Sequence, residues 1–542
     1  MLEHGSGPRI RRLVHGAVWA AALAVFGYHL LLELRSVPLQ EPMGMWDTIY
    51  ASIARTWPHQ YQWGNYVLGH DNYGPGYPAF CRPFIALIGN VYVAHRAANV
   101  VALAASCILL GWLLRSNRCP AYAAAGLLSV FFALNAGSYS IQARPDFLVL
   151  LLILSVLAVG QLGVVGRLSA PTAGVWIGLL SLAGYLTKPY ALFGWGAAIA
   201  GLWAFVGFRF AAVAGLLSAA VVAAGMVLVA SLNPLYLIET FYAHVAHTSR
   251  DAGWLAHQTA DFSELAFAPV AAALIAGVAW ARARRAPPDG VRGGAGADRA
   301  TAYWALVLGL ALLVLVASLG WHTGAYLTYY YHLALGPLCV CAVAAFIPRI
   351  GAVDAIWPAL ILALNLCVLM VLAPELPATD AAWTDLRADV LRQDGPVVVD
   401  FLLEPLSRER SGVTVADTGM VRYALDEPDM LRGSSPRLLR AQAEVHAFEK
   451  EQAAQMRAHP PQAIYLQCAW VPTSGGADAL RIQNGLSWCA GEALRDYVGV
   501  RSFRLHPYYF ATNARRQAAG HWEILVIKFM RRPQPSAGAR PQ

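Results

Sequence analysis

Long apolar segments follow one another along the first 372 residues of the chain, with short polar segments between them. A helix needs about 20 predominantly apolar residues to cross the ~30 Å hydrocarbon core of a bilayer, and most of these segments have about that length. The pattern therefore predicts about eleven membrane-spanning helices. We place them at residues 14–32, 91–113, 121–136, 147–165, 172–187, 190–207, 211–231, 266–281, 302–319, 328–347 and 354–372. Residues 1–372 would form one α-helical polytopic membrane domain.

The pattern changes after this domain. Residues 373–530 contain no further run of that length, and charged residues become frequent enough for a water-soluble domain of ordinary size. Strands are predicted at 396–401, 463–466 and 523–529, and an exposed helix at 437–457. We expect a small α/β domain at 373–530, followed by a disordered tail at 531–542.

The chain carries a net charge of +8, which on its own would suit a nucleic-acid-binding protein. Its arginines, however, are spread through short loops and form no basic stripe, which argues against nucleic acid. They follow the positive-inside rule instead. With eleven spans placed as above, most of the loop arginines fall on the same side of the membrane as residues 9–12. We expect a multi-pass protein of the cell inner membrane, with a cytoplasmic N-terminus, a retained first span and an extracytoplasmic domain at 373–530.

The predicted first outer loop, residues 35–78, combines carboxylates with aromatic side chains. Its carboxylates include Glu41, Asp47 and Asp71. Carboxylates accept protons from sugar hydroxyls and aromatic rings cover the apolar faces of sugars, although an aromatic belt at the membrane interface has the same composition. Residues 46–57 have the pattern of an amphipathic helix lying on the membrane. Asp47, in its first turn, is either a catalytic carboxylate or a partner of the helix dipole.

The turn-forming motif YGPGYP, residues 73–78, closes this loop. The apolar segment that follows is too short to span the membrane, so we expect a re-entrant or interfacial helix there, carrying Arg82.

Two cations fall at the outer membrane boundary, where charged residues are costly. Arg144 and Asp146 flank a proline before the fourth span, and Lys188 stands between two apolar segments with almost no loop to hold it in water. A bidentate guanidinium and a mobile ammonium together suit the phosphate of a lipid head group. The structural alternatives are that Arg144 pairs with Asp146 and that Lys188 snorkels to the interface.

The other polar residues predicted on the outer side are weaker candidates. His244 and His247 are spaced as on one helical face, but a metal site would need more ligands. His322 would contact an acceptor or belong to an aromatic belt. We assign no metal ligand and no certain cofactor, and the sequence leaves a divalent metal ion open.

The order of these features on one side resembles the GT-C superfamily of membrane glycosyltransferases. The resemblance is carried by the acidic first loop with its surface helix, YGPGYP, RPDFLVLLL at 144–152 and YLTKPYALF at 185–193. It covers about residues 10–350. The chain is most similar to the bacterial branch related to protein mannosyltransferases and lipid A aminoarabinose transferases, also described as RgtA/B/C/D-like.

This resemblance implies an enzyme that transfers a sugar from a polyprenyl-phosphate-linked donor to a lipid, glycan or protein acceptor. Carried over by position, Asp47 would be the general base and Glu41 its alternate, while Lys188 and Arg144 would hold the donor phosphate. Supporting or substrate-contacting roles would fall to Asp71, Tyr73, Tyr77, Arg82, Asp146 and His322. A lipid-linked glycan transporter or flippase is the alternative, but it would distribute cations through the bilayer rather than at one boundary.

Overall fold

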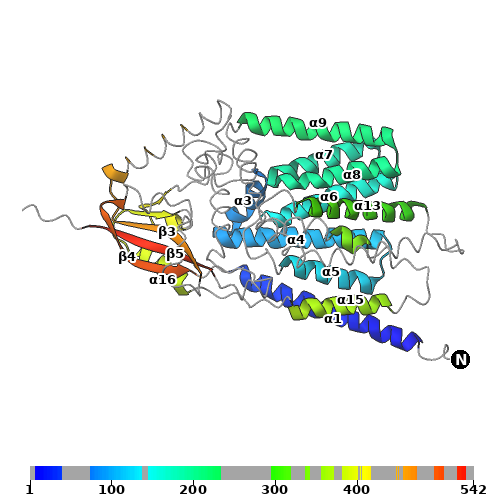
Figure 1. Ribbon diagram of the computed structural model, residues 1–542, viewed down its shortest axis with the longest axis horizontal. Coiled ribbons are helices and arrows are strands. Elements are labelled where there is room, and N and C mark those ends of the chain that lie inside the picture. The colour runs from blue at the N-terminus through cyan, green and yellow to red at the C-terminus, as the bar shows by residue number, and fades with distance from the viewer. Residues whose placement is uncertain are drawn as a thin grey trace, which may run out of the picture.

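The structure is a computed structural model with a helical bundle and a smaller sheet-containing domain (Figure 1). It describes residues 7–38, 74–136, 145–232, 295–318, 336–341, 356–371, 381–400, 403, 406–416, 443, 447, 450, 454, 456–472, 494–505 and 522–532.

Nine of the eleven predicted spans coincide with helices of the bundle. These are α1 (Gly7–Ser36), α4 (Val91–Ser116), α5 (Ala121–Ala136), α6 (Asp146–Val164), α7 (Ala170–Thr187), α8 (Leu192–Phe205), α9 (Phe208–Leu232), α13 (Ala295–Ser318) and α15 (Ile356–Val371). Among the described residues, five helices are long and apolar enough to cross a membrane by length and composition, and shorter apolar helices accompany them. The helical, polytopic character is thus confirmed. The total of eleven stays a prediction, because 266–281 and most of 328–347 lie outside the described residues.

Helix α6 lies at the centre of the bundle and packs against α4, α7, α8 and α13. It is buried along most of its length, so it carries apolar residues on all sides. Its polar residue Gln161 is only 4% exposed and accepts hydrogen bonds from Asn117 at the end of α4 and from the Trp304 indole of α13. The side-chain oxygen of Gln161 thus links α4, α6 and α13. This link lies far from the end of the bundle that carries the buried charges described below.

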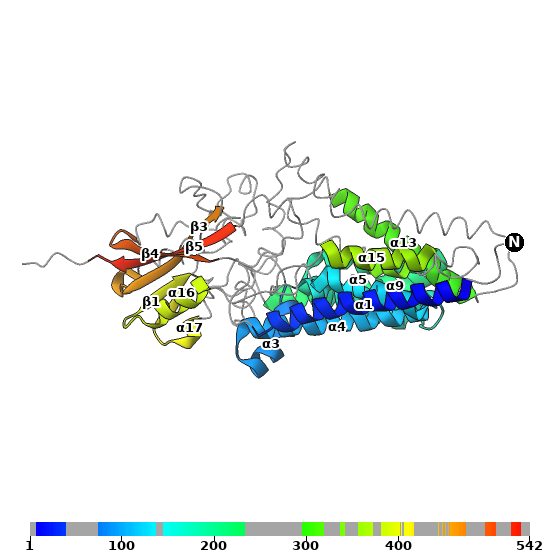
Figure 2. The same cartoon turned by 90° about the horizontal axis from the view of Figure 1, so that it is seen from below.

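A short helix, α3 (Gly76–Ile88), precedes α4 and is separated from it by a sharp turn. Gly89 has a φ of 79°, which glycine adopts without strain, and the Asn90 side chain accepts a hydrogen bond from the Val93 N–H at 3.1 Å. With 13 residues, α3 is too short to cross a bilayer. It lies at the end of the bundle that faces the sheet (Figures 1 and 2).

The C-terminal region contains a five-stranded sheet of order β2-β1-β3-β5-β4. Its strands are β1 (Val397–Asp400), β2 (Val413–Ala416), β3 (Ala463–Pro472), β4 (Tyr497–Leu505) and β5 (Trp522–Arg531). β1 is parallel to β2 and β3, whereas β5 is antiparallel to β3 and β4. Helices α16 (Ala381–Leu391) and α17 (Leu406–Glu409) pack on one face through an apolar core that includes Trp383 and Leu386. The predicted strands coincide with β1, β3 and β5.

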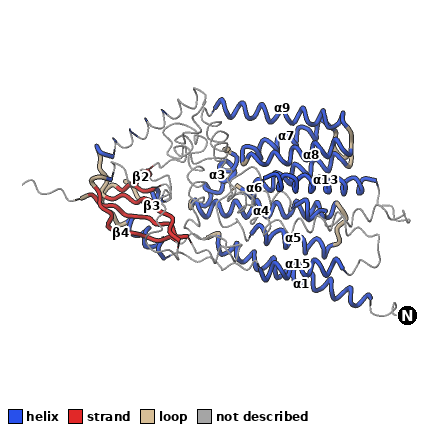
Figure 3. The backbone as a smooth tube through the Cα atoms, in the orientation of Figure 1, coloured by secondary structure: helices blue, strands red, loops and turns tan. Residues whose placement is uncertain are grey.

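The sheet lies beyond one end of the bundle, and the two regions are clearly separate in Figure 3. α1 ends and α4 begins at this end, and α3 covers part of it (Figure 1). We call it the sheet-facing end.

Candidate functional site

The buried charges of the bundle gather at its sheet-facing end. Glu33 lies in the last turn of α1, Arg96 in the second turn of α4, Asp146 at the start of α6 and Lys188 directly after α7. Each is at most 2% exposed, and no other Asp, Glu, Lys or Arg is buried in the described part of the bundle. Ionisable groups at such depth are costly, and they usually mark a functional site.

Exposed arginines are more frequent at the opposite end, although Arg35 and Arg82 are exposed at the sheet-facing end. Those at the opposite end follow or precede the spans at Arg12, Arg115, Arg118, Arg167 and Arg209. An excess of arginine at one end is the distribution that the positive-inside rule describes.

Lys188 and Asp146 form a buried ion pair, with the Lys188 Nζ 2.7 Å from Asp146 Oδ1. The Tyr190 hydroxyl donates to the same carboxylate oxygen at 3.2 Å, and Nζ lies 5.4 Å from the centroid of the Tyr190 ring. The two charged side chains are 3% and 1% exposed. Lys188 therefore does not snorkel to the interface, which was the structural alternative for this residue.

Local sequence explains how this pair forms. α7 ends at Thr187, Lys188 is extended, and Pro189 starts a single 3-10 turn that brings Tyr190 back towards the pair. Proline suits the start of such a turn because its φ is already close to the helical value. Asp146 follows Pro145 at the start of α6, where a carboxylate is favoured by the helix dipole. The RPD and TKPY motifs, 42 residues apart at the paired charges, thus meet at one point.

The YGPGYP turn packs against the end of α7, beside Lys188. A Cβ added to Gly74 would collide with the Leu186 carbonyl, and one added to Gly76 would lie 2.5 Å from the Thr187 hydroxyl oxygen. Both glycines are therefore required by the close approach of two backbones. This contact connects the motif that closes the first loop to the buried ion pair.

Tyr77, the next residue in the motif, joins α3 to α4. Its hydroxyl donates to Asn99 Oδ1 at 3.0 Å and lies 3.3 Å from His95 Nδ1. All three side chains are at most 1% exposed. The hydroxyl of Tyr77 is thus engaged in helix packing rather than presented to solvent.

The predicted site residues divide into two groups. Lys188 and Asp146 come together and Tyr77 lies in the adjoining turn, whereas Arg82 is exposed on α3. The others fall outside the described residues: Glu41, Asp47, Asp71, Tyr73, Arg144 and His322, together with the surface helix at 46–57.

Three residues that the sequence analysis overlooked belong to this end of the bundle. They are Glu33, His95 and Arg96. Each lies within or directly beside a predicted span, and an ionisable residue in such a span is a signal by itself. As for metals, no group of three or more His, Cys, Asp or Glu side chains suited to a metal ion occurs where the structure is described.

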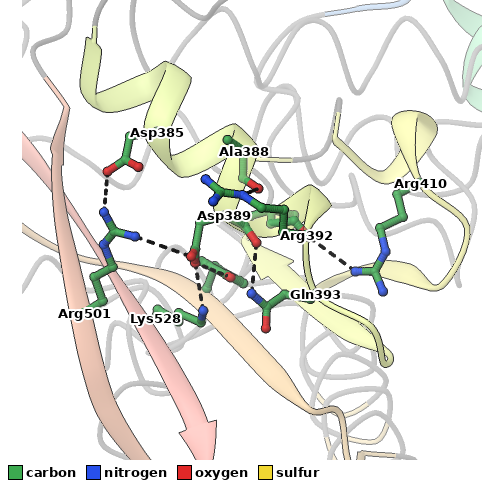
Figure 4. Close-up of polar contacts among 10 residues, drawn as sticks. Asp385, Ala388, Asp389, Arg392, Gln393, Arg410, Arg501 and Lys528 are labelled. Atoms are coloured by element: carbon green, nitrogen blue, oxygen red, sulfur yellow. Dashed lines mark hydrogen bonds and ion pairs between the residues drawn. The ribbon is translucent and has the colours of Figure 1, made fainter.

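A second polar cluster holds α16 on the sheet of the C-terminal region (Figure 4). Asp389 accepts hydrogen bonds from the buried Tyr465 hydroxyl at 2.6 Å and from Lys528 at 2.9 Å, and Arg501 bridges Asp389 and Asp385. Burial alone would raise the pKa of Asp389, but the hydrogen bonds from Tyr465 and Lys528 outweigh it and hold the pKa below its usual value. This cluster joins the segment after α15 to strands β3, β4 and β5.

Comparisons with known proteins give a match in fold but not in sequence. No protein-family model matches the chain, and no curated protein matches it in sequence. Its fold is similar to the crystal structure of ArnT from Cupriavidus metallidurans bound to undecaprenyl phosphate. The superposition covers 96% of this chain and 99% of that chain, with a TM-score of 0.52 and 14% identity. At 14% identity the likeness shows the fold alone, and it agrees with the fold that the sequence resemblance implied.

Proposed function

We propose that the protein is a membrane glycosyltransferase that uses a polyprenyl-phosphate-linked sugar as donor and modifies a lipid, glycan or protein on the extracytoplasmic face. The observation that carries this proposal is the gathering of all buried charges of the described bundle at its sheet-facing end. The fold supports it, because the similar ArnT structure is bound to undecaprenyl phosphate.

Lys188 is suited to the donor phosphate even though it is paired with Asp146. An ammonium group has three N–H donors, so it can bind a carboxylate and a phosphate oxygen together. Arg144 is the second cation, since chain connectivity keeps its Cα within about 7 Å of that of Asp146. A guanidinium and an ammonium around one phosphate would stabilise its charge in a site of low dielectric.

The reaction needs a base, a nucleophile and a leaving group. Asp47, or Glu41 in its place, removes the proton of the acceptor hydroxyl, whose oxygen then attacks the anomeric carbon of the sugar. The bond between that carbon and the phosphate oxygen breaks, and polyprenyl phosphate leaves with the electron pair. Lys188 and Arg144 stabilise the negative charge that develops on the leaving phosphate.

A transporter or flippase for lipid-linked glycans fits the distribution of charge less well. Such a protein moves a charged head group across the bilayer and needs polar partners along the whole path. In the described bundle the buried polar residues away from the sheet-facing end are uncharged, such as Ser106, Ser129 and Gln161, and they bond to neighbouring helices or to their own backbone.

The enzyme proposal is tested in membranes supplied with radiolabelled polyprenyl-phosphate sugars. We expect Asp47→Asn or the double change with Glu41→Gln to abolish transfer, and Lys188→Ala to weaken donor binding. Arg209→Ala, at the opposite end of the bundle, is the matched control and should leave transfer unchanged. Full transfer by the double carboxylate variant would rule out the assigned base, and unchanged donor affinity in Lys188→Ala would rule out the phosphate role.

Sidedness is tested separately by reporter fusions. Fusions after Gly290 and after Pro405 should fall on opposite sides of the membrane, with the second one extracytoplasmic, because an odd number of spans separates Pro405 from the N-terminus. The same side for both would contradict the proposed topology.

A further inference from the structure

His95 presents an unusual combination of burial and hydrogen bonding in the second turn of α4. Its side chain is 0% exposed. The Nδ1 atom lies 3.3 Å from the Tyr77 hydroxyl oxygen, whereas the buried Nε2 atom has no hydrogen-bond partner. Buried polar atoms in folded proteins are almost always bonded, so an exception calls for a functional explanation.

The bonds around Tyr77 determine which ring nitrogen of His95 carries the proton. The Tyr77 hydroxyl has one hydrogen, which it donates to Asn99 Oδ1 at 3.0 Å. Its oxygen must therefore accept the hydrogen bond that it shares with His95, so the proton of the ring sits on Nδ1. A ring buried without a carboxylate partner in the described structure is uncharged, which leaves Nε2 with a lone pair and no hydrogen.

Because Nε2 carries a lone pair and no hydrogen, its partner must be a hydrogen-bond donor or a cation. Nε2 accepts a hydrogen bond from a hydroxyl or amino group, but it has nothing to donate to a phosphate oxygen, which is itself an acceptor. A metal cation is disfavoured as well, because Arg96 is the neighbouring residue and is also fully buried. The matching groups on a glycosylated lipid are those of the sugar.

His95 is connected to the ion pair through two successive contacts. Tyr77 holds the ring, and Gly76 before it contacts Thr187, the residue before Lys188. His95 also lies only one turn inside the start of α4, which is about 6 Å along a helix. The ring and the proposed phosphate site therefore lie at the same end of the bundle and are connected through the YGPGYP turn.

We propose that His95 Nε2 accepts a hydrogen bond from a hydroxyl or amino group of the donor sugar, and that the Tyr77–Asn99 pair orients the ring for this contact. His95 is thus a binding residue that distinguishes the glycosylated donor from bare polyprenyl phosphate. The inference rests on the proposed function of the site and adds the recognition of the sugar to it.

Two substitutions separate this role from a merely structural one. His95→Asn keeps an N–H donor at the position of Nδ1, and so the bond to Tyr77, but removes the acceptor at Nε2. His95→Gln places an acceptor oxygen near the Nε2 position and loses the bond to Tyr77. A ligand role predicts that His95→Asn is the weaker binder, whereas a packing role predicts that His95→Gln is the more damaged.

The full-length protein in nanodiscs is titrated with undecaprenyl phosphate and with undecaprenyl phosphates carrying glucose, mannose, galactose or arabinose. We expect His95→Asn to bind the sugar-bearing lipid that the wild type prefers about tenfold more weakly, which corresponds to the loss of one hydrogen bond. The same variant should bind bare undecaprenyl phosphate as tightly as the wild type does. Equal weakening for both lipids, or none, overturns the inference.

A substrate-side experiment keeps the test independent of how the variants fold. Deoxy analogues of the preferred sugar should bind the wild type more weakly when one particular hydroxyl is missing, and His95→Gln should retain part of that preference. If no single hydroxyl matters, the inference fails while the proposed function stands. If the wild type binds none of the lipids, both fail.

Discussion

The buried pair of Lys188 and Asp146 allows stability and donor binding to be separated. At an effective dielectric constant of about 20, two unit charges 2.7 Å apart attract each other by about 6 kcal/mol. Removing both groups from water offsets most of that attraction, because their side chains are only 3% and 1% exposed. The pair as a whole should therefore contribute little to the free energy of unfolding.

Removal of one partner has a much larger effect than removal of both. Lys188→Met or Asp146→Leu removes the oppositely charged group 2.7 Å from a buried charge, and each should lower the free energy of unfolding by about 3–5 kcal/mol. The double variant replaces the pair with apolar side chains of similar size and should unfold within about 1–2 kcal/mol of the wild type. Donor binding should be lost in Lys188→Met and in the double variant, since both lack the ammonium group that is proposed to hold the phosphate.

The assay is a double-mutant cycle on the protein in detergent micelles, with unfolding followed by tryptophan fluorescence and donor binding by retention of radiolabelled lipid. The expected result is a stable double variant that does not bind donor. Two results would refute the reasoning. Single variants as stable as the wild type would mean that the charges are not buried as a pair, and donor binding by the double variant would mean that Lys188 does not hold the phosphate.

Two further predictions concern the turn beside the pair and the cluster on the sheet. Gly76→Ala should weaken transfer and lower the unfolding temperature, because its Cβ would lie 2.5 Å from the Thr187 hydroxyl oxygen. Gly309→Ala is the control and should have neither effect, since a Cβ there would meet nothing within 4 Å. Equal behaviour of the two variants would contradict the proposed packing. Asp389 has a pKa below its usual value despite burial, owing to its hydrogen bonds, so its contribution to stability is present above about pH 4 and is lost as the pH falls through the lowered pKa. Thermal unfolding between pH 7 and pH 3 should therefore show a smaller acid dependence in Asp389→Asn than in the wild type, and identical profiles would exclude this role.

The ends of the site's helices could be predicted from the sequence, but the contacts between them could not. Proline and the apolar pattern predict where α6 begins and α7 ends, so Asp146 and Lys188 were both expected at the outer boundary. Their pairing depends on which helices are neighbours, and nothing local in the RPD or TKPY motif specifies that. The sequence alone gave no reason to pair Lys188 with Asp146, and the structure shows the two side chains bonded.

His95 and Arg96 were missed for a different reason. They lie in a segment that is strongly apolar over its length, and averaging along the segment conceals two polar residues side by side. In the C-terminal region β4 was missed because a bulge between Gly499 and Arg501 breaks the alternation of buried and exposed residues on which strand prediction depends. β2, with the sequence VTVA, lacks the unbroken run of valines by which the equally short β1 was predicted.

The charges at the sheet-facing end also explain why a single cation is insufficient for the proposed donor. Glu33 and Asp146 contribute two negative charges, and Arg96 and Lys188 two positive ones, so the buried set in the described bundle is neutral. An apolar environment tolerates such a balanced set far better than an excess of either sign. A donor phosphate adds negative charge to this balance, and Lys188 alone cannot compensate it, because its charge is already matched by Asp146. For the proposed enzyme we therefore expect a cation from outside the buried set to take part, and we propose Arg144, two residues before Asp146 in the sequence, for this role.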